Sequence, residues 1–464
     1  MNFRFSKSLQ DFFNYMIAGG LARILPFLLL PYVAKVLTPE NFGFFSLYRL
    51  YTALGSVILL LGVEQGLFRL IPGLHAHERL RYLRAALSFI LIFFIFLTVL
   101  SWPWQKPLNR FFLDPNISFP FLFIPLLILV NALSVLILTF FSACQESRKY
   151  LLGNLLVQGT FFTLFLSGLF LGWQLKAFFI SFIAANLLLL FFNIDLLKSL
   201  RRLSFDWPIL KRLLKTGFPL MLVLLLTYLL YQSDHYLIKF YLGVEQTGIY
   251  NYGYRFASML LIFVVQSNNV WFPRIYARGE DFFRQHVGAY AALIALSCAG
   301  ILWILLLLFH YFPSLLLPAG FEVSKTVLLI VGLGYMIYGQ AQMIDGWLIL
   351  KNKSNILVGI SAVALAFNLI FNALFIPKFG ILAAATITAF SFLLIWLAII
   401  IYLGRFLNKK ALSVTVLKTA LFTAPFFLLF VYNQPLVWFT LFWFMGLLEF
   451  MRNPLSKILL SFSK

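Results

Sequence analysis

Charge is the scarcest property of this 464-residue chain, because only 11% of its residues are Asp, Glu, Lys or Arg. Acids are the rarer sign, with 15 Asp and Glu against 36 Lys and Arg. Soluble domains carry about 25% charged and about 45–50% apolar residues, whereas this chain is 62% hydrophobic with a mean hydropathy of +0.94. A soluble fold of this length lacks the interior to bury so much apolar surface. The composition therefore excludes a soluble protein and predicts a polytopic membrane protein.

Groups that carry catalysis are also few. The two cysteines, Cys144 and Cys298, lie in or at the edge of apolar runs and are expected to be buried thiols. We find no zinc-ligand spacing, no glycine-rich phosphate loop and no nucleophile placed with a histidine. We therefore expect a protein that is not an enzyme and has no resident cofactor or metal. A membrane polysaccharide polymerase or ligase is the enzymatic alternative, although the short outer loops contain no carboxylate pair.

Long apolar runs dominate the rest of the chain. A membrane-spanning helix needs roughly 17–25 mostly apolar residues, which predicts an all-α fold with about 14 such helices. The predicted runs are 12–36, 43–69, 83–104, 117–143, 149–172, 175–197, 216–241, 247–274, 285–311, 322–349, 353–376, 379–404, 412–432 and 435–451. The connections between them, including 105–116 and 198–215, are predicted to be loops.

The positive charges predict how the chain is oriented. With both termini in the cytoplasm, the inner segments contain 25 of the 36 Lys and Arg residues and the outer segments contain seven. Such a bias follows the positive-inside rule. Because these cations lie in short loops and not on one folded face, we expect contact with membrane lipids and none with nucleic acid.

An internal repeat appears when the chain is shifted by 205 residues. Glu40 then matches Glu245, Gly43 matches Gly248, and an arginine ends the second helix of each copy. Six helices separate the copies, so both copies have the same orientation, as in parallel transporter repeats. We expect a six-helix bundle at 1–200, a second at 201–406, and two additional helices at 407–464.

The segment "VLTPENFGFF" predicts the outer start of the second helix. Thr38 is a capping hydroxyl, Pro39 stands at the first helical position, and Glu40 is an acid in the first turn. Gly43 would allow close packing as the helix enters the membrane.

Arginines inside the predicted spans are candidate site residues, because an ionised group in a membrane helix costs at least a few kcal/mol. Arg23 lies in the first helix, and Arg49 and Arg255 occupy nearly the same place in the two copies of the second helix. Guanidinium groups suit phosphate, since they offer paired donors and a permanent charge. We predict that Arg49 and Arg255, which come from two bundles, face each other across a cleft.

Acids, a histidine and amides provide further candidates. Asp234 would neutralise an arginine or carry a coupling proton or Na⁺, and the neighbouring His235 is a second candidate for carrying the proton. Asn368 and Asn372 have a structural alternative, which is hydrogen bonding between helices. The structural alternative for Glu64 is an ion pair with Arg69 at the membrane interface. The candidates for ion coupling are Asp234, His235, Glu64 and Asp345, and those for the polar cavity wall are Gln266, Asn268, Asn269 and Asn368.

Several stretches together resemble the polysaccharide-transport family. They are "AKVLTPENFGFFSLY", "YQSDHYLIKFYLGVEQTGIYNYGYRF", "VWFPRIY" and "FNLIFNALFIPKFGILAAATIT". This family is the O-antigen, or lipid-linked oligosaccharide, flippase branch of the multidrug/oligosaccharidyl-lipid/polysaccharide (MOP) exporter superfamily. The resemblance covers about residues 10–405.

The resemblance implies a V-shaped, MATE-like pair of six-helix bundles in the bacterial inner membrane. It implies a flippase that moves undecaprenyl-diphosphate-linked oligosaccharide by alternating access, coupled to an ion gradient. Arg23, Arg49 and Arg255 would then bind the diphosphate. Expected partners are the lipid-linked oligosaccharide, a polysaccharide polymerase and a chain-length regulator, with the flippase itself a monomer. A multidrug or cation exporter of the same superfamily is the alternative.

Overall fold

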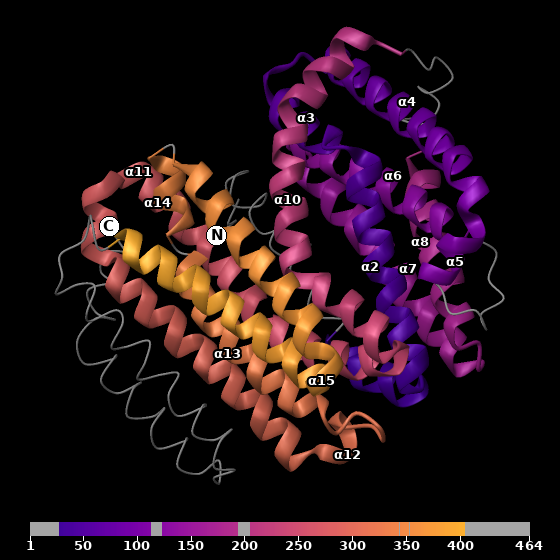
Figure 1. Cartoon of the computed structure of the whole chain (residues 1–464). Coiled ribbons are helices and arrows are strands. Elements are labelled where there is room, and N and C mark those ends of the chain that lie inside the picture. Colours follow the sequence, from indigo (N-terminus) through magenta and orange to yellow (C-terminus); the bar gives the residue numbers. More distant parts are fainter. Residues whose placement is uncertain (1–26, 113–122, 194–204, 343, 352, 404–464) are drawn as a thin grey trace, which may run out of the picture. The chain divides into compact units, whose positions relative to one another are not determined.

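The computed structural model describes residues 27–112, 123–193 and 205–403, without Met343 and Asn352. Its regular elements are all helical, and no strand occurs within these ranges (Figure 1). Eight helices of the described chain are long and apolar enough to cross a membrane. The predicted all-α membrane fold is therefore confirmed. The predicted runs 412–432 and 435–451 lie outside the described residues, so the total of 14 stays a prediction.

The described chain forms two compact units. Of the described residues, those in 27–29 and 44–228 belong to unit 1 and those in 30–43 and 229–403 belong to unit 2. The chain passes from one unit to the other within the helix Phe27–Val36, within α2 (Pro39–Leu60) and within α10 (Trp207–Leu242). Each unit is described below by itself. The boundaries predicted at 200 and 406 lie outside the described residues.

Unit 1 contains most of α2 and the first part of α10. Between them come α3 (Val63–Leu70), η1 (Ile71–Gly73), α4 (Ala76–Ser101), η2 (Trp102–Trp104), α5 (Gln105–Phe112), α6 (Phe123–Ala143), α7 (Ser147–Phe170) and α8 (Leu175–Phe192). Its core joins α3, α4, α6 and α10 through fully buried leucines such as Leu67, Leu83, Leu136 and Leu213. The first part of α10 is thus an integral element of this unit.

Unit 2 contains the helix Phe27–Val36 from Leu30 onward, the start of α2 and the second part of α10. They are followed by α11 (Val244–Tyr311), α12 (Pro313–Leu316), α13 (Ser324–Gln342), α14 (Asp345–Leu350) and α15 (Ser354–Leu403). Helices α11, α13 and α15 pack side by side (Figure 1). Both α11 and α15 bend sharply at a glycine, Gly279 with φ 76° and Gly380 with φ 70°. Each therefore consists of two of the predicted runs joined at a residue that tolerates positive φ.

Several predicted boundaries were wrong. The run 43–69 is broken by left-handed backbone at Leu61 (φ 47°) and Gly62 (φ 83°), which separates α2 from α3. The connection 198–215 was predicted to be a loop, but α10 already begins at Trp207. The reason is amphipathicity: Leu210 and Leu213 are buried while the lysines and arginine among them are exposed. Part of the connection 105–116 is likewise helical, as α5.

The predicted start of α2 is confirmed. The helix begins at Pro39, and the Thr38 hydroxyl accepts a hydrogen bond from the backbone N–H of Asn41 at 3.3 Å. This bond satisfies one of the donors that the first turn of a helix leaves open.

Glycines allow α2 and α11 to touch at their starts, within unit 2. A Cβ added to Gly43 would overlap the carbonyl oxygen of Val244, and one added to Gly248 would overlap that of Pro39. Val244 and Gly248 are the residues that the 205-residue shift matches to Pro39 and Gly43. The contact is therefore reciprocal, as a contact between two related helices around a two-fold axis is.

Candidate functional site

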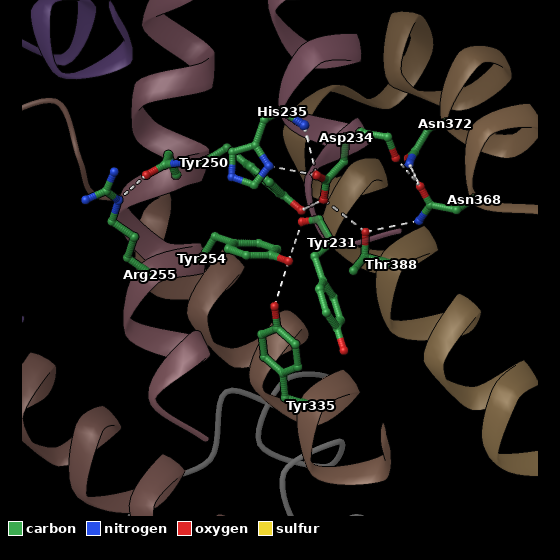
Figure 2. A network of polar contacts seen from close by, with 12 residues as sticks. Tyr231, Asp234, His235, Tyr250, Tyr254, Arg255, Tyr335, Asn368, Asn372 and Thr388 are labelled. Atoms are coloured by element: carbon green, nitrogen blue, oxygen red, sulfur yellow. Dashed lines mark hydrogen bonds and ion pairs between the residues drawn. The ribbon is translucent and has the colours of Figure 1, made fainter. Parts of the chain in front are cut away.

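A buried carboxylate on α10 is the centre of a polar network in unit 2 (Figure 2). Asp234 is 1% exposed. Its Oδ1 accepts a hydrogen bond from the backbone N–H of His235 at 2.9 Å and lies 2.7 Å from Nδ1 of the same residue. Its Oδ2 accepts hydrogen bonds from the hydroxyls of Tyr250 and Thr388, the latter at 3.1 Å. Three helices, α10, α11 and α15, thus supply donors to one carboxylate.

Two asparagines extend this network along α15. Asn368 and Asn372 are fully buried and lie one turn apart, and Nδ2 of Asn372 donates to Oδ1 of Asn368 at 2.9 Å. The same oxygen accepts the hydroxyl of Ser233 at 3.2 Å, and Nδ2 of Asn368 lies 3.2 Å from the Ser391 hydroxyl. These bonds join α10 to both arms of α15, one on each side of the bend at Gly380. Interhelical bonding, the structural alternative stated above, is therefore one role of this pair.

Tyrosines enclose the other side of the network. The His235 ring makes edge contacts with Tyr250 and Tyr254, whose ring centroids lie 5.0 and 4.7 Å from its own. The Tyr254 hydroxyl donates to the backbone carbonyl of Tyr231 at 2.5 Å and accepts from the Tyr335 hydroxyl at 2.6 Å. Nε2 of His235 is buried and has no hydrogen-bond partner in the described part of the chain.

The sequence did not single out these tyrosines, because 20 tyrosines are spread along the chain. Tyr250 and Tyr254 are one helical turn apart and share the face on which Tyr250 reaches Asp234. That spacing was the available signal. Thr388 and Ser391 lie in the apolar stretch "AATITAFS", where nothing local distinguishes them.

Each unit contains one of the two matched arginines. In unit 2, Nε of Arg255 donates to Oδ1 of Asn251 at 2.5 Å, and its guanidinium carbon lies 5.7 Å from the centroid of the Phe42 ring. In unit 1, the guanidinium carbon of Arg49 lies 5.8 Å from the centroid of the Phe45 ring, one turn back on α2. In the described part of the chain, no carboxylate forms an ion pair with Arg49. Their predicted juxtaposition across a cavity stays a prediction, as each unit is described by itself.

The remaining candidates in the described ranges lie on α3, α11 and α14. Glu64 is 4% exposed in the first turn of α3 in unit 1, and its Oε2 has no hydrogen-bond partner among the described residues. Asp345 begins α14. On α11, Gln266 is exposed and Asn268 is buried, with its Oδ1 unpartnered in the described ranges. Arg23 and the side chain of Asn269 lie outside the described residues.

No group of three or more His, Cys, Asp or Glu side chains comes together among the described residues in a way that would hold a metal ion. The network around Asp234 consists instead of one carboxylate, one imidazole, amides and hydroxyls. Such groups accept and release a proton or bind a hard cation.

The comparisons with known proteins begin with a family model. A model described as "Polysaccharide biosynthesis protein" matches residues 8–277. An uncharacterised membrane protein of Methanocaldococcus jannaschii is 26% identical over 221 residues. That match covers 45% of this chain and 43% of the archaeal protein, so the chain spans less than half the length of this relative.

Solved structures resemble the chain along almost its whole length. The lipid II flippase MurJ, in an inward closed conformation, matches 94% of this chain and 97% of its own, with a TM-score of 0.69 and 15% identity. An inward-facing MATE family transporter of the MOP superfamily matches 90% of this chain and 96% of its own, with a TM-score of 0.56 and 13% identity. A single-residue mutant of the MATE transporter VcmN of Vibrio cholerae covers 87% of this chain and 97% of its own, with a TM-score of 0.52 and 17% identity. The fold is therefore that of MurJ and the MATE transporters.

Proposed function

Because the chain belongs to the polysaccharide biosynthesis protein family, we propose that it is a flippase for lipid-linked oligosaccharides. It moves an undecaprenyl-diphosphate-linked repeat unit of O-antigen, capsule or exopolysaccharide across the bacterial inner membrane. The membership and the MurJ-like fold support membrane transport. The choice of a lipid diphosphate as the substrate rests on the arginines.

Arg49 is the observation that carries this choice. It lies in a helix apolar enough to span a membrane, and no carboxylate forms an ion pair with it in the described ranges. An uncompensated guanidinium in such a helix is costly, so a function must retain it. A diphosphate provides the missing charge and matches the paired donors of a guanidinium.

The repeat gives this arginine a counterpart. Arg255 stands one residue out of register with Arg49 in the second copy, and its Nε is held by Asn251. A permeant organic cation would be repelled by two such residues, which disfavours a cation exporter. We propose that the two arginines bind the diphosphate together while the lipid tail stays in the bilayer.

Reconstitution into liposomes tests the proposal. We would compare the native chain with Arg49→Ala, Arg255→Ala and the double variant, using a short-chain polyprenyl-diphosphate disaccharide with a fluorescent label. Losing one charge-assisted contact costs about 1.5–3 kcal/mol, which corresponds to roughly 10- to 150-fold weaker binding. The double variant should therefore lose flipping altogether.

Arg69→Ala is the matched control, because Arg69 is exposed at the end of α3 in the same unit as Arg49. This variant should flip at the native rate. Native flipping by the double variant would refute the diphosphate role. Export of cationic drugs by a chain that does not flip the lipid would favour the multidrug alternative.

A further inference from the structure

The contacts of Asp234 restrict which ion this site can take. A carboxylate has about four lone-pair sites, and four donors already occupy them: the backbone N–H and Nδ1 of His235 and the hydroxyls of Tyr250 and Thr388. A hard metal cation binds oxygen lone pairs at short distance. Na⁺ would therefore have to displace two of these hydrogen bonds before it reached Asp234. A proton needs no such rearrangement if another lone pair is open.

His235 offers that lone pair. Its Nδ1 lies 2.7 Å from Oδ1 of Asp234, so with an ionised carboxylate Nδ1 bears the hydrogen. The neutral imidazole then has its acceptor lone pair on Nε2. Nε2 is buried in a side chain that is 2% exposed, and it has no hydrogen-bond partner among the described residues.

The surroundings stabilise the protonated ring. Asp234 supplies a full negative charge beside the imidazolium, with its Oδ1 2.7 Å from Nδ1 of His235. A neutral imidazole beside an ionised Asp234 leaves the pair with a net charge of −1 inside a membrane protein. Adding the proton makes the pair neutral overall, which is the less costly state in a low dielectric.

Among the described residues, the hydrogen bonds and ring contacts that join this pair to other helices come from uncharged groups. The ionisable groups that face it are Tyr250 and Tyr254 on α11 and, behind them, Tyr335 on α13. Helix α15 contributes uncharged amides and hydroxyls. Two cations are near in the sequence, Lys239 one turn along α10 and Arg255 beside Tyr254, but the four hydrogen bonds to Asp234 come from neither.

We infer that the transport cycle is coupled to protons and that Nε2 of His235 takes up the proton, an inference that rests on the proposed flippase function. The step forms one N–H bond between the lone pair of Nε2 and a proton from hydronium, whose O–H bond breaks and which leaves as water. Protonation changes the net charge of the Asp234–His235 pair, to which α10, α11 and α15 all supply groups. The imidazolium also gains a second N–H donor at Nε2 that needs an acceptor, so the protonated state favours a different packing of these helices.

Gradients across liposomes test the inference with the same fluorescent polyprenyl-diphosphate disaccharide. With no gradient, the native chain should equilibrate the lipid between leaflets. A gradient of one pH unit in Na⁺-free buffer should accumulate the lipid on one side up to about tenfold if one proton moves per lipid. A Na⁺ gradient at equal pH should accumulate none. Accumulation driven by Na⁺ and not by the pH gradient would overturn the inference without any variant.

His235→Asn isolates the residue, because the amide can replace the Nδ1 donor to Asp234 but does not titrate. This variant should still equilibrate the lipid and should lose the accumulation driven by the pH gradient. His286→Asn is the matched control, since Nδ1 of His286 is bonded at 2.9 Å to the carbonyl of Phe282, outside the network. It should accumulate the lipid like the native chain.

Each outcome has a distinct meaning. Tenfold accumulation by the His235→Asn variant would overturn the role of His235. Failure of the folded native chain to equilibrate the lipid at all would instead refute the flippase proposal. If His235→Asn lowers the melting temperature so far that it cannot be reconstituted, the comparison of pH and Na⁺ gradients on the native chain decides.

Discussion

Gly43→Ala perturbs the contact between the starts of α2 and α11 by a single methyl group. The added Cβ would overlap the carbonyl oxygen of Val244 and lie 2.8 Å from its Cγ1. The optimal van der Waals separation of two carbon atoms is about 3.5–4.0 Å. The two helices must therefore separate by roughly an ångström. The atom in the way is backbone and cannot rotate aside. Overpacking of this kind costs about 1–3 kcal/mol.

Helical glycines in open surroundings provide the controls. A Cβ at Gly359 on α15, or at Gly159 on α7, would meet nothing within 4 Å. There the same substitution should raise stability by up to about 1 kcal/mol, because alanine is the better helix former. We therefore predict that Gly43→Ala lowers the free energy of unfolding and that Gly359→Ala raises it, although both substitutions lie in unit 2.

Thermal unfolding in detergent, followed with a thiol-reactive dye, measures the effect. Cys298 is fully buried in unit 2, so its reaction reports the unfolding of that unit once Cys144 is replaced by serine. A change of 1 kcal/mol shifts the melting temperature by roughly 2–4 °C in a unit of about 150–250 residues. Gly43→Ala should therefore melt about 2–12 °C lower than the native chain.

The reciprocal contact allows a second prediction, about the double variant. A Cβ at Gly248 would overlap the carbonyl oxygen of Pro39 and lie 2.8 Å from the backbone nitrogen of Gly43. One displacement of the helix starts relieves both clashes, so Gly43→Ala and Gly248→Ala together should cost less than the sum of the two. If Gly43→Ala melts at or above Gly359→Ala, the close contact is not part of the folded protein.

Two further predictions concern polar contacts. Asn368→Leu removes the amide that hydrogen-bonds to Asn372, Ser233 and Ser391. It should destabilise unit 2 by about 1–3 kcal/mol, because the buried partners are left unsatisfied. The same thiol-reactive dye measures this effect, and an unchanged melting temperature would contradict the network. Thr38→Ala removes the N-cap of α2. It should lower the free energy of unfolding by only about 0.5–1 kcal/mol, because the capping hydrogen bond is long at 3.3 Å. A decrease above about 2 kcal/mol would mean that Thr38 has another role.

Much of the fold could be predicted from the sequence, because hydropathy and helix caps are properties of single segments. The membrane class followed from composition, and the start of α2 followed from Thr38 and Pro39. The prediction of Asp234 as a site residue rested on the general cost of an acid in an apolar helix, and the structure places this residue at the centre of a buried network. These signals need no knowledge of which helices become neighbours.

The partners of Asp234 could not be predicted in this way. Thr388 lies 154 residues away in sequence, in a stretch with no polar pattern, and its hydroxyl is directed to Asp234 only by the packing of α15 against α10. The break at Leu61 and Gly62 was missed for a related reason. A Cβ at Gly62 would lie 2.5 Å from the carbonyl oxygen of Gly217, so the break fits a close approach of α10 that local sequence does not encode.

The sequence by itself determined that this chain is a helical membrane protein with few charges, because burial in lipid acts on each helix separately. The tertiary structure alone decided which of those charges meet. It joined Asp234 to His235, Tyr250 and Thr388. Hydrogen bonds act only over about 3 Å, so the contacts of a buried carboxylate depend on helix packing, which no single helix specifies.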